Sequence, residues 1–343
     1  MSFFPRAHDE IVLGWPQTKL HLSAAPHPCA PDMAHAMDSR RSIVYHFIDQ
    51  DHDRDNEYAL KIFRASFHLG RPGAMEPVAH HLRKLREIDG LASCDRWCIT
   101  PAACGRTLDI YPELAYSHLM PWMQGTTWSD VHQGHWNVRE LSPWNCLQWA
   151  TSFSGAVAAL EAQGLAHCDL NPSNLMVDTA PNRMKVELVG MEDIWCSAIP
   201  EEGRRRAPNP EYVHPLDATP GPLADRFPSA LLVAEILAWH SSEIQEAFAQ
   251  QMEVLFSKAE LDSRSSPTLG VLKRALQRHH KSLWDLFLRA WESPSPADCP
   301  SLTEWHAALL RVASEKIEYA WMRKAAPSRR TLLNLPDAMA VGR

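Results

Sequence analysis

The residues best suited to chemistry lie in one short stretch, residues 164–178. It contains His167, followed by Asp169 and Asn174, which are five residues apart. A carboxylate can orient or accept a hydroxyl proton, and an amide oxygen can bind a metal ion. The apolar run 175–177 predicts a short strand directly after these polar groups. An alternative is a polar turn between a helix and a hairpin, in which Asn and Pro serve only as turn formers.

The context of these residues resembles the catalytic loop of the protein kinases, in which His-Arg-Asp-Leu-x-x-x-x-Asn precedes a short strand. His167, Leu170 and Pro172 match that pattern, as do Asp169 and Asn174. The resemblance implies that Asp169 orients the hydroxyl that attacks ATP and that Asn174 holds a metal ion. It therefore implies ATP and Mg²⁺ as cofactors.

A further candidate lies upstream, in the strand-like run 58–63 (YALKIF). This run resembles the kinase strand whose lysine contacts the phosphates of ATP, so Lys61 is expected to be both catalytic and cofactor-binding. Kinases pair that lysine with a Glu on the next helix. The helical spacing over 75–88 predicts such a helix, with Glu76 and Glu87 as candidate partners. Either of them could instead be a surface glutamate of an amphipathic helix.

The run 115–123 predicts another strand, and the Gln124-Gly125 pair after it offers a hinge between two lobes. In kinases the adenine ring binds backbone groups of this strip. The resemblance therefore implies cofactor-binding residues between positions 120 and 124, namely Met120, Trp122 and Met123.

The strand and turn at 185–195 stand where kinases carry Asp-Phe-Gly, whose Asp binds magnesium. The match puts Gly190 at that Asp, and glycine has no side chain for a metal ion. Glu192 and Asp193 follow in the turn, so they are the candidates to join Asn174 around the metal. On this interpretation, Gly190→Asp should return the missing ligand and raise any activity.

Two long apolar helices are predicted around residues 164–178, which the resemblance makes the candidate catalytic stretch. Residues 143–163 place apolar side chains at helical intervals, and Gly164 ends this helix as a cap. Residues 225–237 form an almost wholly apolar helix opened by Asp225. In kinases the equivalent helix is the buried post of the larger lobe, and its Asp holds the backbone of the catalytic loop. The region 244–310 also has a helical pattern.

Other positions depart from the kinase pattern. The stretch 35–42 (HAMDSRRS) lacks the glycines with which kinases cradle phosphates on bare backbone. Cys168 replaces the Arg that reads a phosphorylated activation loop, so activation by phosphorylation of the segment 201–214 is not expected. Leu216 and Cys299 stand where kinases pair a Glu with a late Arg, so both partners of that ion pair are missing together.

Length and composition set the outer bounds. The 343 residues carry a net charge of −7, so nothing favours binding to nucleic acid or to a membrane surface. The eight cysteines show no Cys-x-x-Cys pair, which favours reduced and mostly buried thiols over zinc or disulfides. Because there is no signal peptide and no long apolar run, the expected location is cytoplasmic.

The expected fold class is α+β, in a bilobal protein-kinase-like arrangement with a small β-rich N-lobe and a larger, mostly helical C-lobe. The resemblance covers about residues 40–312. The expected segments are an irregular N-terminal arm (1–39), the N-lobe (40–123), the C-lobe (124–312), and a helix end with a basic tail (313–343).

These features fit more than one function. ATP-dependent phosphoryl transfer to a protein Ser/Thr hydroxyl, in an atypical or weak form, is favoured by Asp169 and Asn174. A pseudokinase that binds nucleotide or scaffolds a protein partner is favoured by Gly190 and by the missing glycines of the upstream loop. A small-molecule kinase of the aminoglycoside or choline type would share a similar loop. For the first two functions the expected partner or substrate is another protein.

Overall fold

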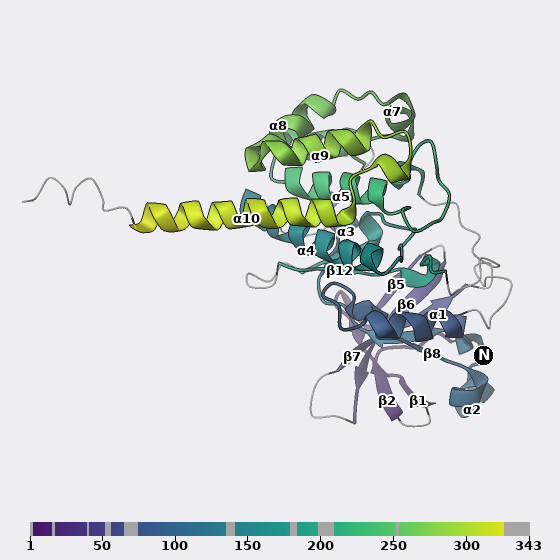
Figure 1. Ribbon diagram of the computed structural model, residues 1–343. Coiled ribbons are helices and arrows are strands. Elements are labelled where there is room, and N and C mark those ends of the chain that lie inside the picture. The colour runs from purple at the N-terminus through teal and green to yellow at the C-terminus, as the bar shows by residue number, and fades with distance from the viewer. Residues whose placement is uncertain are drawn as a thin grey trace, which may run out of the picture.

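The computed structural model describes residues 3–15, 18–39, 41–51, 56–64, 75–134, 141–178, 184–197, 209–251 and 254–325. The protein is of the α+β class, as the sequence predicts. Figure 1 shows a curled sheet with two accompanying helices at one end of the molecule and a larger group of helices at the other.

The main sheet is antiparallel. It runs in the order β1-β2-β6-β7-β9-β8, and β5 pairs with the first half of β6. Along β6, Tyr45 and Phe47 are buried two residues apart, as the period of a strand requires. The strand-like run 58–63 is confirmed as part of β7, which pairs with β6 in an antiparallel hairpin. The strands are β1 (Glu10–Trp15), β2 (Thr18–Ala24), β5 (Ala36–Asp38), β6 (Ser42–Asp49), β7 (Glu57–Phe63), β8 (Trp97–Cys98) and β9 (His118–Pro121).

The sequence predicts an irregular arm over residues 1–39, and this prediction is wrong. In that segment β1 and β2 extend the main sheet, β5 joins β6, and β3 (Pro26–His27) pairs with β4 (Ala30–Ala34). The physical reason is alternation: Ile11 and Leu13 on β1 are buried in the sheet's core. Prolines are common in this segment, but Pro26, Pro28 and Pro31 lie in or beside β3 and β4. These two strands form a separate small sheet, so the prolines do not interrupt the hydrogen bonds of the main sheet.

The helical part is built around α5 (Arg226–Ala238), in which every residue after Arg226 is buried. The predicted helix before the catalytic stretch is α4 (Pro143–Ala162), which Ser142 and Asn145 cap reciprocally. The two helices pack together in one large apolar cluster. The other helices of this part are α3 (Trp128–His132), α6 (Ser242–Gln250), α7 (Lys258–Ser263), α8 (Leu269–His279), α9 (Lys281–Trp291) and α10 (Leu302–Ala325).

Two helices accompany the sheet. The predicted helix over 75–88 is α1 (Met75–Leu82), continued by a 3₁₀ turn. The sequence does not predict α2 (Pro101–Ile110), which packs against β1. There, Cys104 Sγ and Thr107 Oγ1 donate hydrogen bonds to carbonyl oxygens of β1. Through these bonds α2 covers the outer edge of the sheet at β1.

A small antiparallel sheet lies next to the catalytic stretch. It consists of β10 (Thr126–Thr127), β11 (Leu175–Val177) and β12 (Val186–Leu188). Gly125, just before β10, has φ +117°, and a Cβ there would lie 2.3 Å from the carbonyl oxygen of Val177. Only glycine permits this approach. The chain that leaves β9 is thereby held against the strand that follows Asn174.

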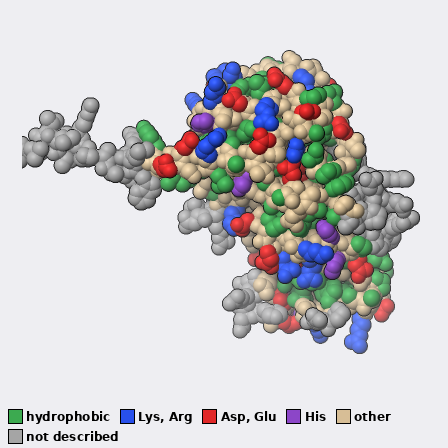
Figure 2. Space-filling model, viewed as in Figure 1, with side chains coloured by type: hydrophobic (Ala, Val, Ile, Leu, Met, Phe, Trp, Pro, Cys, Tyr) green, Lys and Arg blue, Asp and Glu red, His purple; other side chains and the backbone are tan. Residues whose placement is uncertain are grey.

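The helix α10 projects from the helical part (Figure 1) and continues to Ala325, past the expected C-lobe boundary at residue 312. Two predicted segments lie partly outside the described residues: positions 201–208 of the activation segment 201–214, and positions 326–343 of the segment 313–343 with its basic tail. Figure 2 shows acidic and basic side chains interspersed over the visible face of the helical part. None of the helices in the described ranges combines the length and apolar character needed to cross a membrane.

Candidate functional site

The catalytic stretch is anchored to the helical core by Asp225. This carboxylate is buried and accepts hydrogen bonds from the backbone N–H groups of His167 (2.5 Å) and Cys168 (2.9 Å). Burial raises the pKa of Asp225, and these N–H groups oppose that effect. The expectation that the Asp at the start of this helix holds the loop backbone is confirmed.

His167 fixes the same loop to the strand that follows it. Its Nε2 donates to the carbonyl oxygen of Val189 at 2.8 Å, and its Nδ1 accepts from the backbone N–H of Asp169 at 3.2 Å. Since one ring nitrogen donates and the other accepts, the geometry selects one neutral tautomer. The imidazole therefore acts as a strut between the catalytic stretch and the chain after β12.

The Asp169 side chain is buried and held on both oxygens. Asn174 Nδ2 donates to Oδ2 at 3.0 Å and to the Asp169 carbonyl oxygen at 2.7 Å. Asn171 Nδ2 donates to Oδ1 at 3.2 Å. A 3₁₀ turn over Pro172–Asn174 brings Asn174 back towards Asp169. The structure thus brings together two of the residues that the sequence selects, in an arrangement that orients a carboxylate.

Lys61 pairs with Glu192 rather than with a residue of α1. Lys61 Nζ lies 2.8 Å from Glu192 Oε2, and Arg96 Nη1 lies 2.8 Å from Glu192 Oε1. Glu76 and Glu87 are exposed, so neither candidate helix glutamate serves as the partner. Burial alone would raise the pKa of Glu192, but the two cations outweigh it and hold the pKa well below its usual range.

The expectation that Glu192 is a metal ligand is therefore not met in this arrangement. Both of its oxygens are engaged by cations, and a divalent ion would have to displace Lys61 or Arg96. His118 lies beside the pair, and burial lowers its pKa to about 3, so it adds no charge of its own. Glu192 orients Lys61 instead.

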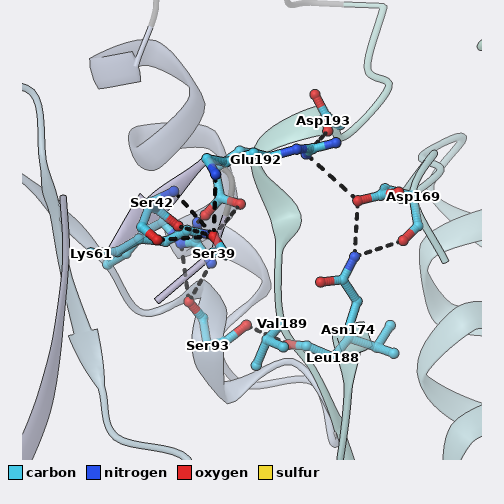
Figure 3. A network of polar contacts seen from close by, with 12 residues as sticks. Ser39, Ser42, Lys61, Ser93, Asp169, Asn174, Leu188, Val189, Glu192 and Asp193 are labelled. Carbon is cyan, nitrogen blue, oxygen red and sulfur yellow. Dashed lines mark hydrogen bonds and ion pairs between the residues drawn. The ribbon is translucent and has the colours of Figure 1, made fainter. Parts of the chain in front are cut away.

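Asp193, the other candidate ligand, faces a third cation. Arg41 Nη1 donates to Asp193 Oδ2 at 2.9 Å and lies 3.7 Å from Asp169 Oδ2. Burial raises the pKa of Asp193, and the charge of Arg41 opposes that effect. Figure 3 shows Asp193, Asp169 and Asn174 on one side of the polar network, with Lys61, Ser39 and Ser42 on the other.

The backbone of the loop before β6 is closed on itself. The N–H groups of Arg41 and Ser42 both donate to Ser39 Oγ, at 3.3 and 3.1 Å, and the N–H of Ser39 donates to the Ser42 carbonyl oxygen. A phosphate at this loop would have to compete with these bonds. The amides described in this loop therefore do not form the open row that a glycine-rich loop provides.

A cavity of about 540 Å³ lies between the sheet and the helical part. Five of the residues that the sequence selects line it: Lys61, Met120, Trp122, Met123 and Asn174. Asp169, Glu192 and Asp193 belong to the polar network that Lys61 and Asn174 join. The Trp122 indole stacks on His46, with ring centroids 4.1 Å apart, which positions the strip after β9.

A magnesium ion does not fit the described arrangement of these side chains. Gly190 offers no ligand, Glu192 is held by two cations, and Asp193 and Asp169 face Arg41. Within the described ranges, no group of at least three His, Cys, Asp or Glu side chains could hold a metal ion. The site is instead neutralised by its own lysine and arginines.

Sequence reasoning did not identify Arg41, Arg96 or Ser39. Arg41 was visible only as one of two adjacent arginines in a stretch noted for its missing glycines. Arg96 is fully buried, yet nothing in its neighbourhood in the sequence signals burial. Only the paired, inward position of these cations shows that they belong to the site.

No family model matches the chain, and no curated protein matches it.

Proposed function

We propose that the chain is a protein-kinase-like module that binds a nucleotide between its sheet and its helical part and acts as a pseudokinase. The cavity of about 540 Å³ carries this proposal, because Lys61, the strip Met120–Met123 and Asn174 all line it. Its volume lies within the range of roughly 300–1,000 Å³ that is typical of small-molecule sites. The separate apolar clusters of the sheet and of the helical part support a bilobal arrangement.

The cavity offers complementary surfaces to a purine nucleotide. Val44, Ala59 and Met176 provide apolar surface for the faces of a base. The strand β9 ends at Pro121, and the N–H of Trp122 makes a last bond to the Glu57 carbonyl oxygen at 2.9 Å. Backbone groups beyond that point can pair with the edge of a base, while Lys61 supplies charge for phosphate.

The electrostatics favour binding over transfer. In the loop before β6, the N–H groups of Ser39, Arg41 and Ser42 are bonded within the loop. Glu192 is paired with Lys61 and Arg96. Without a metal ligand at Gly190, charge developing on a transferring phosphoryl group lacks its usual stabilisation. These features support a nucleotide-binding or scaffolding role that would act through a protein partner.

Phosphoryl transfer to a protein Ser/Thr hydroxyl is the second candidate function. The observation that favours it is the orientation of Asp169, whose two oxygens accept bonds from Asn171 and Asn174 in a loop anchored by Asp225. Such a carboxylate suits the orientation of an acceptor hydroxyl. Transfer of radiolabelled phosphate that Asp169→Asn abolishes, with ATP affinity unchanged, would favour this candidate.

The proposal is tested by titrating the full chain with ATP and with adenosine, following binding by calorimetry. Ala59→Leu places a larger side chain in the cavity and should weaken both ligands at least tenfold. Lys61→Met removes a cation and should weaken ATP about tenfold while leaving adenosine unchanged. Ala307→Leu and Lys185→Met, both on exposed surface, are the matched controls.

The outcomes separate the parts of the proposal. A wild-type chain that binds neither ATP nor adenosine at millimolar concentration contradicts nucleotide binding altogether. If Ala59→Leu binds as the wild type does, the ligand occupies some other place. If Lys61→Met weakens adenosine as much as ATP, the lysine does not face the phosphates.

A further inference from the structure

Arg41 occupies an unusual place for a loop residue. It stands in the turn between β5 and β6, yet its guanidinium reaches the carboxylates of Asp193 and Asp169, which come from the helical part of the chain. The Asp193 side chain is 9% exposed and that of Asp169 is 4% exposed, so this contact is made away from bulk water. At such a site an unbalanced charge is costly.

The described contacts bring three cations and three carboxylates together in this network. Lys61 and Arg96 face the single carboxylate of Glu192. Asp193 and Asp169 lie on the other side, where the guanidinium of Arg41 lies against both. Asn174 stands beside Asp169, and its Oδ1 is so close to Gly190 that a Cβ there would lie 2.4 Å away. Two carboxylates and an amide oxygen are ligand types that a divalent cation takes.

We propose that Arg41 is a built-in counter-ion that takes the place of a divalent cation, so that the cavity accepts a phosphate-bearing ligand without metal. The proposal rests on the proposed function only for the identity of that ligand. The placement of Arg41 between Asp193 and Asp169 is independent of it. A guanidinium can bind phosphate oxygens directly through paired N–H donors, as a metal ion would through coordination.

The charge of Arg41 also determines how the two carboxylates respond to metal ions. With Arg41 in place, its positive charge repels a second cation from Asp193 and Asp169. Without it, the two carboxylates lose the positive charge of this guanidinium and should attract a divalent metal. Removing one arginine should therefore create a metal site that the wild-type protein lacks.

The first experiment measures Mn²⁺ binding to the full chain without nucleotide, by electron paramagnetic resonance. Wild type and the exposed-surface control Arg86→Gln should leave the signal of free Mn²⁺ unchanged at submillimolar protein. Arg41→Gln should bind one Mn²⁺, and Arg41→Gln combined with Asp193→Asn should lose it again. Arg41→Lys keeps the charge and should behave like the wild type.

Either of two results overturns the assignment of Arg41. One is Mn²⁺ binding by the wild-type chain that Asp193→Asn removes, because the acids would then already hold a metal. The other is a folded Arg41→Gln that binds no more Mn²⁺ than the wild type. Equal gains in Arg41→Gln and Arg41→Lys would also contradict the charge argument.

The second experiment compares ATP affinity in EDTA and in Mg²⁺. The wild type should bind equally well in both, within about twofold, whereas Arg41→Gln should be about tenfold weaker in EDTA and recover in Mg²⁺. Affinity of the wild type that depends on Mg²⁺ would contradict the inference. If the wild type binds ATP in neither buffer, the proposed function fails, and the Mn²⁺ experiment still decides the role of Arg41.

Discussion

Gly190→Ala should lower the free energy of unfolding by about 3 kcal/mol, through two separate costs. The backbone of Gly190 has φ +75°, a conformation in which a Cβ costs roughly 1–2 kcal/mol. The added Cβ would also lie 2.4 Å from Oδ1 and 2.7 Å from Cγ of Asn174. Overpacking of that kind costs about 1–3 kcal/mol when neighbours cannot retreat. Asn174 cannot retreat freely, because its amide holds Asp169.

Gly164→Ala is the matched control for the backbone cost. Gly164 has φ +68°, close to that of Gly190, but a Cβ there would meet nothing within 4 Å. It should therefore lose only the conformational part, about 1 kcal/mol. The difference between the two variants, about 2 kcal/mol, isolates the clash with Asn174. Urea unfolding followed by circular dichroism measures both free energies.

Equal losses in Gly190→Ala and Gly164→Ala would refute the close contact between Gly190 and Asn174. Removing the Asn174 side chain as well should relieve part of the loss, since residues in contact are not additive. The same geometry reverses the expectation for Gly190→Asp. Its Cβ meets Asn174 before its carboxylate can reach a metal, so this variant should be unstable and should not gain transfer activity.

Two further variants test the anchoring of the site by Asp225 and the pH dependence of stability that Glu235 causes in the same helix, α5. Asp225→Ala leaves the N–H groups of His167 and Cys168 without their buried acceptor, so it should lower the free energy of unfolding by about 3 kcal/mol. A loss of less than about 0.5 kcal/mol in urea unfolding would contradict the role of Asp225 as the anchor of this loop. Burial raises the pKa of Glu235 to about 8 from an ordinary 4.5, so the folded chain keeps a proton that the unfolded chain releases, and stability should fall as pH rises between these values. Glu235→Gln can still accept a bond from the Tyr212 hydroxyl and should flatten that fall in the melting temperature, while an unchanged slope would show that another group titrates.

The local parts of the site could be predicted from the sequence because each rests on neighbouring residues. The spacing of Asp169 and Asn174 fixes a tight turn, and the apolar run after it becomes β11. The apolar helix opened by Asp225 is likewise a pattern within one segment, and its capture of the loop backbone is confirmed. Such features depend on the periodicity of a strand or helix, which a single sequence displays.

The partners of Lys61 and Asp193 could not be predicted in the same way. Glu192 is 131 positions from Lys61, and Arg41 is 152 positions from Asp193. Charged residues are common in any sequence, and no local pattern marks one that will be buried against a distant opposite charge. The N-terminal strands were not predicted, because the segment is rich in proline near β3 and the alternation of buried and exposed side chains in β1 and β2 is short.

The source of the Lys61 partner bears on how the site could be regulated. In kinases the partner glutamate stands on a helix, so movement of that helix can break the ion pair. Here Glu192 stands in the turn directly after β12. Its second cation, Arg96, lies three residues after Ser93, and the Ser93 hydroxyl donates a hydrogen bond to the carbonyl oxygen of Leu188 in β12 at 2.5 Å. Lys61 is therefore linked through Glu192 to the chain that follows β12, which His167 also contacts at Val189. Because α1 supplies neither Lys61 nor Glu192, movement of α1 would not carry either member of the pair with it.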